Sequence, residues 1–322
     1  MKEVNLNEKL LYLLRTQIPQ KKECVAFLAD LLRMEKGSIY RRVRGDVPFT
    51  LQEAAVIAKE AGISLDQLID YFSPPQFNPY TEKPSKLNIS REEANLIVLR
   101  NYANKIGEIS TCPASEHGHV FNFFPVELAV SYPHLLKFII FRFLHLFGDN
   151  AMLQSFESYT VSPKIQEELY RLEYYLRQIG ATSYIWDPSI VSHTVDNIHY
   201  FMDMNLIQPQ EATCLKKDLF SFLEDLERDA SEGQFPSGKR FDLYIAGIHI
   251  GFTHSYLCSD SSYMNILMSY MLQPITLFDR QSCLQAKNRF NCLRKLSTLI
   301  SEVGIKERIQ FFKEEHKIVE RL

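Results

Sequence analysis

Apolar residues recur at helical spacing from the start of the chain. Leu6, Leu10, Leu13 and Leu14 share one face of a helix over about residues 6–16. The same kind of spacing predicts further helices before residue 73. They cover residues 21–32, residues 36–44, a segment that begins at Thr50 and a segment that ends near Phe72. Residues 1–72 are therefore expected to form one compact five-helix unit.

Local start and stop signals mark the ends of these helices. Gly45 follows the third helix, and a glycine in the left-handed conformation ends many helices. Thr50 and Glu53 have the spacing of a capping box, in which each side chain accepts a hydrogen bond from the other residue's backbone N–H. Ser64 and Gln67 repeat this spacing. The fourth and fifth helices are therefore expected to begin at Thr50 and Ser64.

Residues 73–89 interrupt the helical pattern. They contain four prolines, and proline blocks both helices and sheet ladders. We expect this proline-rich segment to be an extended linker. Ser90 and Glu93 then form another capping box. The chain is thus divided into a helical domain at residues 1–72, the linker and a larger domain at residues 90–322.

The larger domain is expected to be mostly helical up to about residue 232. Residues 135–147 are its most apolar segment, but Lys137 and Arg142 interrupt them and they are too short to span a bilayer. We interpret this segment as a buried helix. Further helices are predicted over about residues 164–179, 187–204, 209–230, 279–301 and 305–321.

Residues 239–258 have a different pattern. Apolar and polar residues alternate there, and aromatic and β-branched residues are frequent, as in strands. Ala246 and Gly247 separate two such runs, so a hairpin turn is expected at this dipeptide, and residues 263–270 are expected to add a strand. The sequence predicts a mainly α fold: a five-helix N-terminal domain, a linker, and a mostly helical C-terminal domain with a small antiparallel sheet near residues 239–270.

Positive charge is concentrated in one short segment of a slightly acidic chain. The net charge is −3, whereas residues 21–44 contain seven basic and three acidic residues. A local basic face orients a protein on nucleic acid without making its whole surface adhesive. The six cysteines form no C-x-x-C pair, which fits a reducing compartment. The charged N-terminus has no signal-peptide pattern, so a cytoplasmic location without membrane association is expected.

Residues 28–45 have the apolar spacing of a helix-turn-helix. Its two crossing helices need a small residue where they touch, and Ala29 supplies one. The apolar residues expected to hold the turn and the second helix are Leu28, Leu32, Met34, Ile39 and Val43. The positions left facing outward are Glu35, Lys36, Gly37, Ser38, Tyr40, Arg41, Arg42 and Arg44. A short helix that is apolar on one side and rich in arginine on the other suits the DNA major groove.

With its five helices, this segment resembles the lambda-repressor-like helix-turn-helix family, the Cro/repressor type, over about residues 5–72. That family often has glycine at the turn, where a left-handed backbone is useful, and this chain has Arg33 there. The resemblance implies that the early residues of the second helix reach base edges, and these are Lys36, Gly37, Tyr40 and Arg41. Phosphate contacts are expected from Lys21, Lys22, Ser38, Arg42 and Arg44.

A longer pattern, at residues 40–64 and 295–314, resembles a family of bacterial regulators in which a helix-turn-helix precedes a long, poorly characterised domain. This resemblance implies a transcription regulator and no known ligand. The alternative is that the arginines form an ordinary solvated face. DNA binding is favoured because three arginines within four positions stand next to Tyr40 on the outward side of the motif.

The larger domain offers no convincing catalytic or metal site. Cys112 lies near the run Glu-His-Gly-His at residues 116–119, but zinc needs about four ligands and no second pair stands at a recognised spacing. A polar loop is therefore expected there. His249 and His254 are five residues apart, which places them on opposite faces of a regular strand and disfavours a shared ligand.

Two other features of the larger domain have competing explanations. Ala246-Gly247 matches the scissile dipeptide of some self-cleaving phage-type repressors, but a hairpin turn explains it better. The dense aromatic residues either line a ligand pocket or form the core, and the core is favoured. They are Phe121, Phe123, Phe124, Phe138, Phe141, Phe143, Phe147 and Trp186.

The chain is interpreted as a sequence-specific DNA-binding transcription regulator that is not an enzyme and uses no cofactor or metal. One recognition helix reads few bases, so a homodimer on an inverted repeat is expected, with its two helices about 34 Å apart. The larger domain is expected to dimerise, to bind an effector or a protein partner, or to do several of these. The alternative function is a protein-interaction scaffold that is tethered to DNA and has no small-molecule effector. An enzyme with a DNA-binding appendage is disfavoured by the lack of a catalytic motif.

Overall fold

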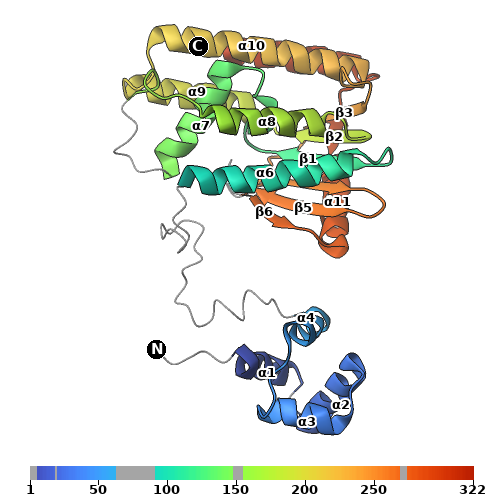
Figure 1. Ribbon diagram of the computed structural model, residues 1–322. Helices are drawn as coiled ribbons and strands as arrows, with labels where there is room; N and C mark the ends of the chain where they lie inside the picture. Colours follow the sequence, from blue (N-terminus) through green and yellow to red (C-terminus); the bar gives the residue numbers. More distant parts are fainter. Residues whose placement is uncertain (1–5, 19, 63–90, 148–154, 269–273) are drawn as a thin grey trace. The chain divides into compact units, whose positions relative to one another are not determined.

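A computed structural model describes residues 6–18, 20–62, 91–147, 155–268 and 274–322 (Figure 1). The chain divides into two compact units, Met1–Lys83 and Pro84–Leu322. The predicted fifth helix and the predicted linker lie outside the described residues, as does the capping position at Ser90.

The described part of the first unit is helical. Its helices are α1 (Leu6–Gln17), α2 (Lys21–Leu32), α3 (Lys36–Arg44) and α4 (Leu51–Glu60). The predicted bounds of the first three helices and the predicted start of the fourth are confirmed to within one residue. The apolar faces of these helices form one core, which includes Leu10, Leu14, Val25, Leu28, Ile39, Val43 and Ile57.

Both predicted signals at the ends of α3 and α4 are present. Gly45 ends α3 with a φ of 88°, in the left-handed region. At the start of α4, Thr50 Oγ1 accepts from the N–H of Glu53 at 3.2 Å, and Glu53 Oε2 accepts from the N–H of Thr50 at 2.9 Å. This capping box satisfies two N–H groups at the end of the helix that have no partner within it.

The second unit is α/β, because its helices cover a seven-stranded mixed sheet (Figure 1). The strands are β1 (Glu116–Phe121), β2 (Ala181–Trp186), β3 (Arg240–Ala246), β4 (Thr253–Cys258), β5 (Tyr263–Met268), β6 (Pro274–Leu277) and β7 (Ser297–Leu299). Their order across the sheet is β6-β5-β4-β1-β2-β3-β7. The prediction of a mainly α domain with a small antiparallel sheet was wrong in this respect.

The centre of the sheet is parallel. β1, β2 and β3 run in the same direction, with Val120 opposite Ile185 and Ile185 opposite Tyr244. β4 is antiparallel to β1, and the outer strands are antiparallel to their neighbours. Helices make the long connections that parallel strands require. They are α7 (Pro133–Phe147) and α8 (Pro163–Leu176) between β1 and β2, and α9 (Ile190–Asp203) and α10 (Pro209–Glu232) between β2 and β3.

The predicted hairpin at Ala246-Gly247 was wrong. β3 pairs with β2 and β7, whereas β4 pairs with β1 and β5, so the two strands flanking this dipeptide are not neighbours. The N–H of Gly247 instead donates to the carbonyl of Leu296 at 3.1 Å. The hairpin is formed by β4 and the predicted further strand β5, and the N–H of Ser259 donates to the carbonyl of Ser262 between them at 2.9 Å.

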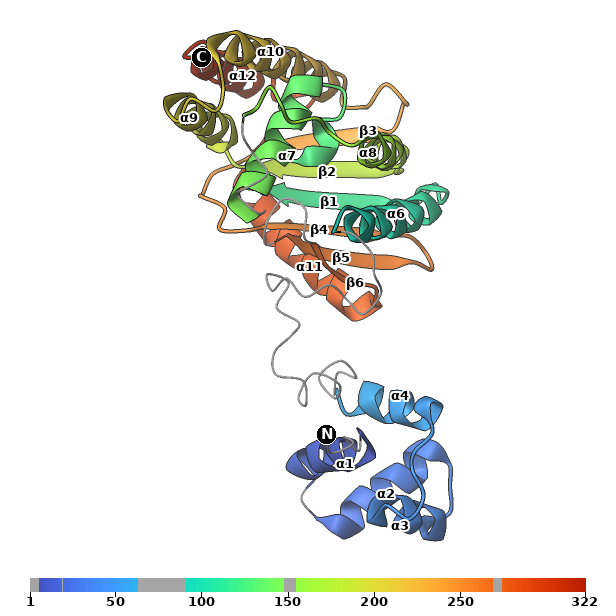
Figure 2. The ribbon, with the colours of Figure 1, turned by 60° about the vertical axis from the view of Figure 1, so that its left-hand side comes forward.

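The two faces of the sheet are covered unequally (Figure 2). The larger core includes Phe121, Tyr184 and Trp186 and packs against helices from α6 (Arg91–Ser110) to α10, together with α12 (Ile305–Val319). The smaller core, on the other face, joins Val120 and Ile185 to α11 (Arg280–Arg294). The helix predicted over residues 279–301 was too long, because its last part forms the edge strand β7.

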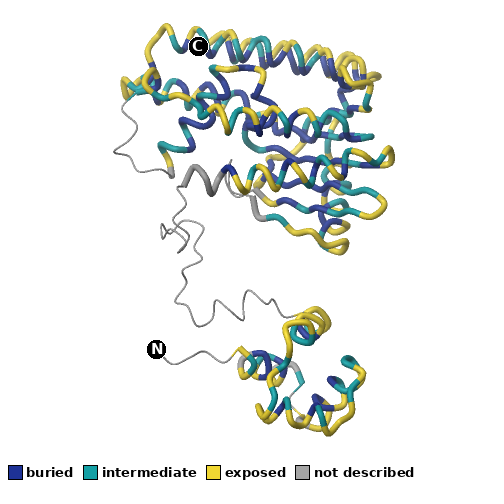
Figure 3. Tube along the Cα trace, in the orientation of Figure 1, coloured by how far each residue is buried: buried dark blue, intermediate teal, exposed yellow. Residues whose placement is uncertain are grey.

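The predicted buried helix is confirmed as α7, and the tube of Figure 3 shows how much of it and of the central strands is buried. Most of the aromatic residues predicted as core are buried in the larger core, whereas Phe123 is half-buried and the side chain of Phe147 lies outside the description. No helix in the described ranges is both long enough and apolar enough to cross a membrane.

Candidate nucleic-acid interface

The turn between α2 and α3 depends on a left-handed arginine. Arg33 has a φ of 53° and a ψ of 45°. Its N–H donates to the carbonyl of Asp30 at 3.3 Å, and the N–H of Met34 donates to the carbonyl of Ala29 at 3.0 Å. These bonds satisfy carbonyls at the end of α2. Arg33 thus adopts the conformation that glycine usually supplies at this turn, at a modest energetic cost.

The inner side of α3 is fixed by the core. Ile39 and Val43 are buried, and Leu28 of α2 is fully buried against them in the same cluster. The other apolar residues predicted for the motif, Ala29, Leu32 and Met34, are half-buried and pack against this cluster. Arg15 of α1 donates from Nη2 to the carbonyl of Val43 at 3.3 Å. The orientation of α3 within the unit is therefore set by contacts with both α1 and α2.

The outer side of α3 presents the predicted base-reading residues together. Lys36, Gly37, Tyr40 and Arg41 are all exposed, and residues three or four positions apart lie side by side on a helix. A Cβ placed on Gly37 would meet no atom within 4 Å. Packing within this unit therefore gives no reason for glycine in the first turn of α3.

The predicted phosphate-contacting residues fall into different environments. Lys22 and Arg44 are exposed, and Ser38 is half-buried. Arg44 Nη2 lies 3.0 Å from Asp46 Oδ2, and both side chains are about half exposed, so water screens this pair strongly. The side chain of Lys21 lies outside the described part of the chain.

Arg42 lies in a different environment from the other arginines of α3. Its Nη2 is 2.9 Å from Glu53 Oε1 and its Nε is 3.2 Å from Glu53 Oε2, and the two side chains are only 14% and 16% exposed. Desolvation acts to raise the pKa of Glu53, but hydrogen bonds from Thr50 and Arg42 outweigh it and lower that pKa. Arg42 therefore fastens α3 to the start of α4.

The predicted polar loop near Cys112 was wrong, because residues 116–121 form the central strand β1. His117 and His119 are buried there, and burial lowers the pKa of His117 to about 3 and that of His119 well below its usual value. His119 Nδ1 lies 3.5 Å from Glu127 Oε1, and burial raises the pKa of Glu127 to about 7. Within the described ranges, no group of three or more histidine, cysteine, aspartate or glutamate residues could hold a metal ion.

The two later histidines are also placed differently from the prediction. His254 lies on β4 and is buried, whereas His249 lies between β3 and β4 and is exposed. His249 Nδ1 is 3.1 Å from Oδ2 of Asp187, a buried carboxylate at the end of β2. Asp187 also accepts hydrogen bonds from Ser189 and from the N–H of Ile250, so this carboxylate holds the 249–250 segment in place.

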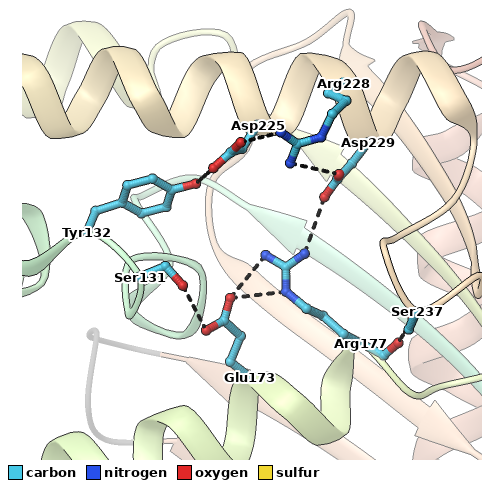
Figure 4. Close-up of polar contacts among 8 residues, drawn as sticks. All are labelled: Ser131, Tyr132, Glu173, Arg177, Asp225, Arg228, Asp229 and Ser237. Atoms are coloured by element: carbon cyan, nitrogen blue, oxygen red, sulfur yellow. Dashed lines mark hydrogen bonds and ion pairs between the residues drawn. The ribbon is translucent and has the colours of Figure 1, made fainter.

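A cluster of charged residues that sequence reasoning missed lies at the C-terminal end of α8 and on α10 (Figure 4). It consists of Glu173, Arg177, Asp225, Arg228 and Asp229. The signal in the sequence was the presence of charged residues at helix positions adjoining the predicted apolar stripes. Glu173 and Asp229 are buried, although an isolated ionised carboxylate would be costly there.

Part of the chain matches a known domain family. Residues 4–102 match the BetR domain, an N-terminal helix-turn-helix-type DNA-binding domain. The matched range contains all of α1 to α4 and the first part of α6. No curated protein and no solved structure gives a significant match to the chain. DNA binding is thus implied by the domain match.

Proposed function

We propose that the chain is a transcription regulator that binds double-stranded DNA in a sequence-specific manner, as a homodimer on an inverted repeat. The observation that carries this proposal is the outer side of α3, where four predicted base-reading residues are exposed while Ile39 and Val43 hold the inner side in the core. The match to the BetR domain supports the DNA-binding part of the proposal.

Each residue of the outer side has a role in the proposal. Lys36 and Arg41 donate hydrogen bonds to guanine O6 and N7, and Tyr40 packs on a thymine methyl group or bonds a phosphate. Gly37 lets the backbone of α3 come close to the groove, since nothing in the unit occupies the space beside it. Lys22, Ser38 and Arg44 contact phosphates, which positions the helix without reading sequence.

The structure leads us to assign Arg42 a positioning role instead of a phosphate contact. Its guanidinium already makes two hydrogen bonds with Glu53 and is mostly shielded from water. A phosphate would have to compete with that carboxylate. Arg42 is therefore proposed to set the angle of α3, while Arg41 and Arg44 face the DNA.

The proposal includes a dimer because one short helix reads too few bases for useful affinity. A dimer that neutralises about six phosphates should show a slope near −5 for log K against log salt concentration. The second unit is proposed to supply the dimer contacts and a regulatory input, without catalysis.

The test is an in vitro selection of genomic fragments by the full-length protein, with the Arg41→Ala variant as control. An enriched inverted repeat that the variant no longer selects supports the proposal. Enrichment of single half-sites contradicts the dimer, and equal recovery of all fragments by a folded protein contradicts sequence-specific binding. Retained DNA binding without response to any small molecule favours the scaffold alternative.

A further inference from the structure

Two of the six cysteines meet in the smaller core of the second unit. Cys258 is the last residue of β4, and Cys283 lies in the first turn of α11. α11 lies across β4 and β5 on this face of the sheet (Figure 2). Cys283 is a fully buried member of the apolar cluster there, and the half-buried Cys258 packs against the same cluster. The fold thus brings together two thiols that are distant in the sequence.

The polar contacts of these thiols place their sulfur atoms side by side. Cys283 Sγ donates to the carbonyl of Leu257 at 3.3 Å, so it lies against the peptide bond that precedes Cys258. The side chains of Cys258 and Cys283 also share a hydrogen bond. A disulfide forms where two sulfurs can meet without movement of the backbone. Two thiols that already share a hydrogen bond meet that condition.

A basic side chain stands next to this thiol pair. Lys287 follows Cys283 by four positions on α11, so the two side chains are neighbours on the helix surface. The ammonium group of Lys287 forms an ion pair with Glu116 of β1. Cys258 Sγ lies 3.9 Å from Oε2 of the same carboxylate. The positive charge is therefore held beside both sulfur atoms by a contact between the helix and the sheet.

The surroundings of the pair favour a reactive thiolate. The hydrogen bond from Cys258 outweighs burial and lowers the pKa of Cys283, and the N–H of Met264 and the charge of Lys287 act in the same direction. The same hydrogen bond raises the pKa of Cys258, so the pair loses one proton readily and retains the other. The thiolate is the nucleophilic form of cysteine. Because Cys258 is half-buried, a small oxidant can reach the pair at this residue.

We propose that Cys258 and Cys283 form a site of reversible oxidation, at which a peroxide converts the two thiols into a disulfide that joins β4 to α11. One sulfur, as the thiolate, attacks an oxygen of hydrogen peroxide, the O–O bond breaks, and the departing hydroxide takes up a proton and leaves as water. The second sulfur then attacks the resulting sulfenic acid and loses its proton, while the S–O bond breaks and a second water leaves. Two thiols and one hydrogen peroxide thus give one disulfide and two waters, with the sulfurs oxidised and the peroxide reduced. The site is independent of the proposed DNA-binding function.

The test is peptide mapping of the full-length protein after treatment with hydrogen peroxide and blocking of the remaining thiols with N-ethylmaleimide. Trypsin cleaves after Arg280, so Cys258 and Cys283 fall in separate peptides, residues 241–280 and 281–287, with one cysteine in each. We expect mass spectrometry to find these two peptides linked, and dithiothreitol to separate them.

Two outcomes of this experiment overturn the proposal. One is the absence of the linked peptides from a folded protein in which peroxide has oxidised the exposed Cys292. The other is linkage of Cys258 to Cys112 in place of Cys283. Fluorescence of the buried Trp186 shows whether the second unit stays folded during the treatment.

Variants test the role of the neighbouring charge and the identity of the thiols. Cys258→Ser should abolish the linked peptides, whereas Cys292→Ser, at an exposed position on the same helix as Cys283, should retain them. Lys287→Gln should slow formation of the disulfide several-fold, because less thiolate is present, and Lys295→Gln, at an exposed position at the end of α11, should not. Equal rates in the two lysine variants contradict activation of the pair by Lys287. The result for the parent protein decides whether the disulfide forms, even if one of the variants proves unfolded.

Discussion

The carboxylate of Glu53 is shared between two helices, because it accepts two hydrogen bonds from Arg42 of α3 while it caps the first turn of α4. The same side chain thus fixes where α4 begins and how α3 lies against it. α3 is therefore held by a polar contact at one side and by the apolar core at the other.

Replacing Arg42 should loosen α3 without touching the proposed base-reading residues. We expect Arg42→Ala to lower the free energy of opening of α3 by about 1 kcal/mol, because a shielded, two-pronged ion pair is lost. Hydrogen–deuterium exchange of peptides from residues 36–53 measures this. The exposed Arg44→Ala is the matched control, and equal protection in the two variants would contradict a structural role for Arg42.

The same ion pair gives the first unit a defined acid sensitivity. The pKa of Glu53 is lowered in the folded state, so its contribution to stability is complete above the ordinary carboxyl pKa and is lost as the pH falls through the lowered one. In the parent protein, the protection of α3 against hydrogen exchange should decrease below about pH 4. The Glu53→Gln variant should be less stable than the parent near neutral pH, and its protection should decrease less as the pH falls. An equal decrease in the variant and the parent would show that Glu53 is not the group that titrates.

The two left-handed positions flanking α3 should respond oppositely to substitution. Arg33 bears a side chain at a φ of 53°, so Arg33→Gly relieves strain and should stabilise the first unit by about 0.5 kcal/mol. Gly45 has a φ of 88° and open space around it, so Gly45→Ala should cost about 1 kcal/mol through strain alone. Hydrogen exchange of α2 and α3 tests both, and a loss of protection in Arg33→Gly would count against a strained turn.

Substitutions of Arg41 and Arg44 should distinguish base recognition from phosphate contact. We expect Arg41→Ala to cost about 1–3 kcal/mol on the selected site and to relax one base position. Arg44→Ala should weaken specific and random DNA alike and reduce the salt slope by about 2, because a dimer loses one phosphate contact in each subunit. Fluorescence anisotropy with both kinds of DNA, at several salt concentrations, measures these effects. Identical losses on specific and random DNA for both variants would contradict the proposed division.

Glu315 should make the second unit less stable as the pH rises. This carboxyl lies buried on α12, and burial, with a smaller effect of Glu314, raises its pKa to about 8. A raised carboxyl pKa contributes stability at low pH and loses it as the pH rises from the ordinary value towards 8. Glu315→Gln should therefore exceed the parent in stability by at least about 1 kcal/mol at pH 9, and by much less at pH 5.

Trp186 provides the measurement for that comparison. It is the only tryptophan of the chain and lies in the larger core, so its fluorescence reports unfolding of the second unit alone. Glu307→Gln, at an exposed position on the same helix, is the control. A pH-independent difference between the parent and Glu315→Gln would show that the buried carboxyl does not titrate as stated.

The helices of the first unit could be predicted because each has its own local signals. Gly45 and the Thr50–Glu53 capping box mark ends that depend on a few neighbouring residues, and Ile39 and Val43 are separated by one helical turn. The exposure of Lys36, Tyr40 and Arg41 follows from that spacing. The pairing of Arg42 with Glu53 could not be read, because nothing local in the sequence distinguishes it from the exposed Arg41 and Arg44.

The strands β1 and β2 could not be predicted, since their pattern depends on burial from both faces, whereas the strand-like runs that form β3 and β4 were recognised. β1 and β2 lie between layers of helices and therefore lack the alternation of a half-exposed strand. The histidines and the glycine of β1 give this strand a composition that is typical of a polar loop. The prediction of a hairpin at Ala246-Gly247 was wrong for a related reason. Adjacent runs of strand-like residues pair with each other only when the sheet topology places them side by side.

The position of β4 between β1 and β5 has a consequence for how the second unit folds. Asn122 at the end of β1 receives a hydrogen bond from Thr253, which is 131 residues later in the chain. During synthesis, β1 can pair with β2, and β2 with β3, while the other edge of β1 stays open until β4 emerges. Non-local pairing of this kind is slow, and an uncovered edge strand invites pairing with other chains. Nascent chains that stop before residue 253 should therefore aggregate, whereas the completed sheet has only β6 and β7 at its edges.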